Sequence, residues 1–70
     1  MNAKQATFAI LNRLPDGAEI GGVELCNLVR RRLGSRIMDA TTNRYLRIYR
    51  AVRNVNCISK PKSLYRITGK

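Results

Sequence analysis

The spacing of apolar residues along this 70-residue chain predicts three helices followed by a β-hairpin. Apolar positions recur every three or four residues within 3–14, 23–33 and 40–53, as they do on helix faces that pack against a core. The stretches 55–59 and 64–68 are rich in β-branched and aromatic residues, which favour strands. The chain therefore reads as one domain over residues 1–70, of the α+β class and mainly helical.

Local signals set the limits of these elements. Asn2 is suited to cap the first helix, and Pro15-Asp16-Gly17 ends it because proline cannot continue a helix and Asp-Gly favours a turn. A short extended stretch at 18–20 is a candidate third strand. Gly34 is a natural C-cap for the second helix, and Asp39 is suited to cap the third.

The third helix has one apolar and one basic face. Successive steps of about 100° place five residues on the face expected to be buried, with Ile48 at its margin. These five are Thr42, Tyr45, Leu46, Tyr49 and Val52. The opposite face has Ala40, Asn43, Arg44, Arg47, Arg50 and Ala51. We expect the tyrosines to be core residues rather than base-stacking aromatics, and Asn54 to end the helix in a left-handed conformation.

The composition is strongly basic. Fourteen Lys and Arg against four Asp and Glu give a net charge of +10 at pH 7, and no acidic residue follows Asp39. An excess this large destabilises a small compact body, which favours a polyanionic partner. Ten of the fourteen cations are arginine, whose planar fork suits phosphates and guanine edges. Nucleic acid is thus the expected partner, and a membrane is not, because the large apolar residues are assigned to the core.

Catalytic and metal-binding chemistry has little support. The sequence has no His, and Cys26 and Cys57 alone do not make a zinc site. We therefore expect no enzyme activity, no cofactor and no metal, and no small-molecule ligand is evident. The apolar run at 8–11 is too short for a secretory signal or a membrane span. A cytoplasmic location with two free, buried cysteines follows as the expectation.

Two stretches resemble winged helix-turn-helix DNA-binding domains. The segment 39–47, Asp-Ala-Thr-Thr-Asn-Arg-Tyr-Leu-Arg, is similar to the start of a recognition helix. The segment 60–68, Lys-Pro-Lys-Ser-Leu-Tyr-Arg-Ile-Thr, is similar to the wing and closing strand of PadR-type bacterial transcription regulators. Three points depart from the pattern: the turn before the third helix is long, no Gly precedes Lys60, and a C-terminal dimerisation helix is absent from the sequence.

The resemblance implies a phage or bacterial regulator, or an architectural protein, that binds duplex DNA. The helix at 40–53 would enter the major groove, and the wing at 60–66 would contact phosphates or the minor groove. The residues expected at DNA are Thr41, Asn43, Arg44, Arg47 and Arg50 on the helix, Lys60, Lys62 and Arg66 on the wing, and Arg30, Arg31 and Arg36 nearby. Arg44 or Arg47 could bind guanine bidentately, and Asn43 could bind adenine.

Two alternatives remain open on the sequence. The first is RNA binding, although A-form RNA hides its major groove from side chains. The second is a winged-helix protein-interaction module that binds an acidic protein surface. We also expect a homodimer on DNA, since one short module offers few base contacts and two half-sites would raise specificity.

Overall fold

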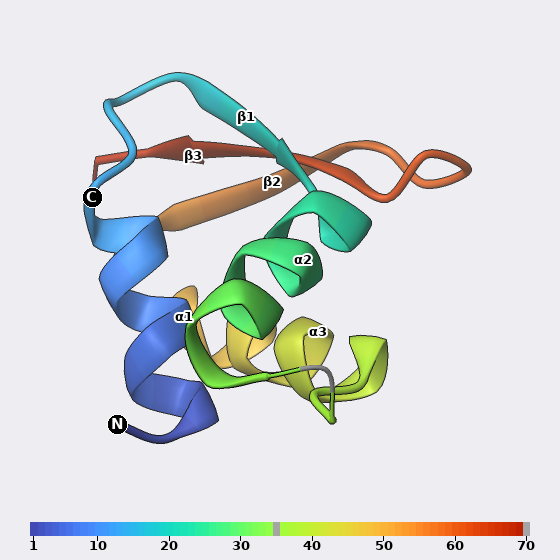
Figure 1. Ribbon diagram of the computed structural model, residues 1–70. Helices are drawn as coiled ribbons and strands as arrows, with labels where there is room; N and C mark the ends of the chain where they lie inside the picture. The colour runs from blue at the N-terminus through green and yellow to red at the C-terminus, as the bar shows by residue number, and fades with distance from the viewer. Residues whose placement is uncertain (35, 70) are drawn as a thin grey trace.

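The computed structural model describes residues 1–34 and 36–69, which form three helices packed on one side of a three-stranded sheet (Figure 1). The helices are α1 (Ala3–Asn12), α2 (Gly22–Leu33) and α3 (Asp39–Tyr49), and the strands are β1 (Ala18–Gly21), β2 (Asn54–Ser59) and β3 (Leu64–Thr68). The central strand β3 pairs antiparallel with both neighbours, in the order β1-β3-β2. The predicted α+β class and the short strand near 18–20 are confirmed, and the layout agrees with a winged helix.

The three helices share one core with the inner face of the sheet. Leu11, Leu25, Val29 and Tyr49 are completely buried, as is Ile67 from the sheet. The start of α1 is fixed by a capping box, since Asn2 Oδ1 accepts from the Gln5 N–H at 2.8 Å and Gln5 Oε1 accepts from the Asn2 N–H at 3.0 Å. The predicted cap at Asn2 is thereby confirmed.

The sheet has one apolar and one polar face, as the period of two residues along a strand requires. Register aligns Val55 with Ile67 on the face that packs against the helices. On the outer face Glu19 and Asn56 both lie opposite Arg66, and all three are exposed. A bulge between Cys57 and Ser59 in β2 shifts the register just before the hairpin loop. That loop, residues 60–63, projects beyond the helical body (Figure 1).

Helix α3 is shorter than predicted. It ends at Tyr49, and the residues up to Arg53 form turns that lead into β2, so Arg50 is the C-cap and not an interior residue. Asp39 is the first helical residue and Met38 the N-cap, so the predicted Asp39 cap is wrong. Asn54 begins β2 and has no positive φ, so the predicted left-handed end at Asn54 is also wrong.

Two predicted core residues lie at the surface. Val52 is 47% exposed because the helical periodicity that placed it inside stops three residues earlier. Cys57 is exposed, on an edge strand beside the bulge, whereas Cys26 is fully buried. Both thiols are free, as expected, but only one is buried.

Candidate nucleic-acid interface

Helix α3 is held by a narrow buried stripe that leaves most of its circumference to solvent. Thr42, Leu46 and Tyr49 are at most 2% exposed, and the Thr42 hydroxyl donates to the Asp39 carbonyl oxygen at 3.0 Å. Tyr45, expected in the core, is half-buried. On the other side, Arg44 and Arg47 are exposed, and Arg50 extends this basic surface at the C-cap.

The hairpin loop carries two further cations. Lys60 and Lys62 are exposed, and the loop is closed by a hydrogen bond from the Ser63 N–H to the Lys60 carbonyl oxygen at 3.1 Å. Ser63 adopts a left-handed φ of 48°, and its carbonyl oxygen accepts from the Gly22 N–H at 2.8 Å. The base of the wing is therefore tied to the first residue of α2. We name Arg44, Arg47, Arg50, Lys60 and Lys62 the basic surface.

The acidic residues pair with other arginines. Within the described residues, Asp16 pairs with Arg53 at 2.8 Å, Glu19 pairs with Arg66 at 3.0 Å, and Asp39 lies 3.8 Å from Arg30. The basic surface takes part in none of the ion pairs found in this part of the protein. Three of the four acidic residues thus neutralise arginines outside the basic surface and leave its five cations uncompensated.

Two of the arginines expected at DNA make bonds within the fold. Arg30 Nε donates to the Ile37 carbonyl oxygen at 2.8 Å, which joins α2 to the turn before α3. Arg66 lies on the outer face of the sheet, and its Nη2 bonds Glu19 Oε2 across the strands. The sequence gives no sign that Glu19 and Arg66 pair, because they lie 47 residues apart.

The other expected contacts differ in accessibility. Arg31 lies exposed on α2, and Arg36 lies exposed in the turn that precedes α3. Thr41 is half-buried in the first turn of α3. Asn43 is also half-buried, and a Cβ added at Gly22 would lie 3.1 Å from its Oδ1. Asn43 is therefore enclosed between α3 and the start of α2, and does not share the open exposure of Arg44.

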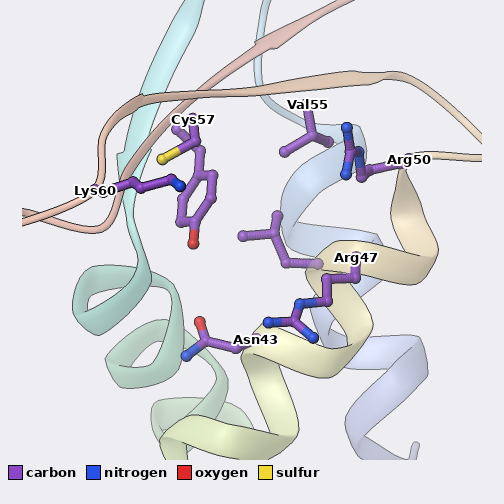
Figure 2. Close-up of a pocket in the computed structure, with 8 residues that line it drawn as sticks. Asn43, Arg47, Arg50, Val55, Cys57 and Lys60 are labelled. Carbon is purple, nitrogen blue, oxygen red and sulfur yellow. The ribbon is translucent and has the colours of Figure 1, made fainter.

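A pocket of about 370 Å³ opens between α3 and the β2–β3 hairpin. Its polar lining comes from Asn43, Arg47, Arg50 and Lys60, and Figure 2 shows Lys60 and Arg47 pointing into the space from opposite sides. The remaining lining residues are Leu46, Val55, Cys57 and Tyr65. Asn43 Oδ1 is buried and has no hydrogen-bond partner among the described residues. Sequence reasoning found the cations but missed Cys57 and Tyr65, which β2–β3 register places opposite each other.

No protein-family model, curated protein or solved structure matches this sequence. Within residues 1–34 and 36–69, no helix has the length and apolarity needed to cross a membrane. The same residues contain no cluster of three or more Cys, Asp or Glu residues that could hold a metal ion.

Proposed function

We propose that the protein binds double-stranded DNA through the basic surface of α3 and the wing. The supporting observation is that α3 and the hairpin loop carry five exposed cations with no acidic partner among the described residues. Three of the four acidic residues pair instead with Arg30, Arg53 and Arg66. Phosphates would supply the missing counter-charges and release their condensed counterions. The likeness of segments 39–47 and 60–68 to winged-helix regulators supports the same partner.

In this proposal α3 lies in the major groove and the wing contacts the flanking backbone. Arg44 and Arg47 are exposed in the helix and would reach base edges, where a bidentate pair with guanine contributes about 1–3 kcal/mol of discrimination. Arg50, Lys60 and Lys62 would contact phosphates, together with Arg31 and Arg36. Asn43 is enclosed, so the proposal assigns base contacts to Arg44 and Arg47 and not to Asn43.

The protein would act by occupying its site, as a transcription regulator or an architectural protein in the cytoplasm. Two copies on half-sites one helical turn apart, about 34 Å, would raise the specificity of so small a module. Light scattering of the DNA complex measures this directly. A mass of two protein molecules per duplex supports the dimer, and a mass of one molecule at saturation rejects it.

Fluorescence anisotropy on a random duplex across a salt series tests DNA binding itself. If the five cations assigned to the backbone each neutralise one phosphate, the slope of log K against log salt is about −4.5. These five are Arg31, Arg36, Arg50, Lys60 and Lys62. The double variant Arg44→Ala/Arg47→Ala should lose most of the affinity. Arg13→Ala/Arg32→Ala removes the same charge from exposed sites outside the basic surface, and should bind almost as the wild type does.

Equal losses in the two double variants would reduce the interaction to net charge alone and contradict the role of α3. If the wild type does not bind duplex DNA even at low salt, the DNA proposal is wrong. Duplex RNA and an acidic protein surface are then the partners to test. An acidic protein that stays bound in excess random duplex would identify a protein-interaction module.

A further inference from the structure

We propose that the pocket between α3 and the hairpin binds a small phosphate monoester with an aromatic ring, of the kind represented by nucleoside monophosphates. Sequence reasoning predicted no small-molecule ligand. The pocket's volume of about 370 Å³ falls within the range of small-ligand sites, about 300–1,000 Å³. The cations and the aromatic ring that line the pocket together define the chemistry of the ligand.

The cations of the pocket select a strongly anionic group. Arg47 and Arg50 come from the end of α3, and Lys60 comes from the hairpin loop (Figure 2). No acidic residue lines the pocket, and none of the three cations has an ion-pair partner among the described residues. A phosphate monoester has nearly two negative charges at pH 7 and several acceptor oxygens, which suits two guanidinium forks and one ammonium.

The rest of the lining selects an organic body attached to the phosphate. Tyr65 supplies a half-buried aromatic ring, on which a planar ring can stack. Leu46 and Val55 also line the pocket, but they are only 2% and 7% exposed and offer a ligand little surface. Inorganic phosphate would satisfy the cations and leave the Tyr65 ring in contact with water.

Occupation of the pocket would oppose DNA binding. Arg47, Arg50 and Lys60 belong to the basic surface, so a bound phosphate would take the same cations that the duplex needs. This regulatory consequence rests on the proposed function, whereas the ligand site itself does not.

The test is a titration of the 70-residue chain with AMP in the absence of DNA, monitored by calorimetry and by amide NMR shifts. Adenosine and inorganic phosphate are parallel probes at constant ionic strength. We expect AMP to bind at least tenfold more tightly than either, with shifts at Asn43, Cys57 and Tyr65. If inorganic phosphate binds as tightly as AMP, or if AMP does not bind, the proposal is overturned.

Two arginines of α3 provide a matched pair of variants. Arg47→Ala should weaken AMP binding about tenfold, since it removes one charge-assisted contact. Arg44→Ala removes the same charge from an exposed position outside the pocket and should leave AMP binding unchanged while weakening DNA binding. Equal losses of AMP affinity in both variants would show general attraction to a basic protein and reject the site. Lys60→Ala, in the loop, repeats the test without altering a helix.

Competition separates the ligand site from the DNA proposal. AMP that binds with the expected dependence on Arg47 supports the pocket whether or not the protein binds duplex DNA. Displacement of a bound duplex by AMP but not by adenosine supports the regulatory consequence. A protein that binds duplex DNA through α3 but shows no AMP binding retains the proposed function and loses the ligand site.

Discussion

The Arg53 guanidinium joins the end of α1 to the start of β2 through its 2.8 Å bond to the Asp16 carboxylate and two further hydrogen bonds. Its Nη1 donates to the carbonyl oxygens of Leu11 at 3.0 Å and Leu14 at 2.7 Å. Carbonyl groups at the end of a helix have no partner within it, so the Arg53 guanidinium caps the end of α1 from a position 39–42 residues away in the sequence.

Replacing Arg53 should therefore destabilise the fold without touching the basic surface. Arg53→Ala leaves the carbonyl oxygens of Leu11 and Leu14 without this donor, and we expect the melting temperature to fall by several degrees. The melting temperature of Arg53→Lys should fall less than that of Arg53→Ala, because the ammonium group retains the positive charge. It should still fall, because lysine lacks the planar guanidinium that bonds several acceptors at once. Asp16→Asn should change little, since the Asp16 side chain is 75% exposed. Thermal unfolding followed by circular dichroism gives this ranking, which equal effects of all three would contradict.

The end of α3 shows where sequence reasoning reached its limit. The order of the helices, the short β1 and the hairpin followed from periodicity and turn residues, which act locally. After Tyr49 no Gly or Pro stops the helix, so the pattern continued to Arg53. The structure ends α3 earlier, where Arg53 meets the end of α1, a contact 39–42 residues apart in sequence. Local propensity gives way to tertiary contacts of this kind.

The candidate site follows the same division. The exposed arginines of α3 were predictable because a buried stripe at helical spacing determines what remains outside. The internal roles of Arg30 and Arg66 were not, since their bonds depend on the turn at Ile37 and on the register that aligns Glu19. The pocket also required register, because it combines α3 residues with β2, β3 and the loop.

Arg30 and Arg31 should separate structural from DNA-binding arginines. Arg30→Ala removes the bond to the Ile37 carbonyl oxygen and should lower the free energy of unfolding by about 1 kcal/mol. The Arg31 side chain is exposed and makes no hydrogen bond or ion pair among the described residues, so Arg31→Ala should leave stability unchanged and weaken duplex binding by the loss of one phosphate contact. Urea unfolding and anisotropy measure the two effects. A stability loss in Arg31→Ala equal to that in Arg30→Ala would contradict the assignment.

Asn43→Ala should stabilise the protein. The change removes a buried acceptor without a partner among the described residues and replaces Asn by a better helix former, so we expect a gain of about 1 kcal/mol. Asn27→Ala is the matched control, since Asn27 is exposed on α2 and reports helix propensity alone. If Asn43→Ala raises the free energy of unfolding no more than Asn27→Ala does, the buried Asn43 oxygen does not destabilise the fold.

Cys26 should make the fold sensitive to alkaline pH. Burial raises the pKa of the Cys26 thiol in the folded state. In the unfolded state the thiol has a pKa of about 8.5, so it loses its proton at a lower pH than in the folded state. Its contribution to stability is present below the unfolded pKa and lost as the pH rises above it. Relative to Cys26→Ala, the wild type should lose stability as the pH rises above about 8.5. Parallel urea midpoints for the two proteins across that range would contradict this prediction.

Alkylation of Cys57 should distinguish charge from bulk in the pocket. Cys57 is exposed and lines the pocket, whereas Cys26 is buried, so alkylation of the native protein should modify Cys57 alone. Iodoacetate adds a carboxylate beside the pocket's three cations, and iodoacetamide adds a neutral group of nearly the same size. We expect the carboxymethyl adduct to weaken both AMP and duplex binding about tenfold more than the carbamidomethyl adduct does. Mass spectrometry confirms the modified residue, and Cys57→Ser treated with iodoacetate is the control. Equal affinities of the two adducts would mean that Cys57 lies outside the electrostatic reach of the bound anion, which contradicts the ligand site described above.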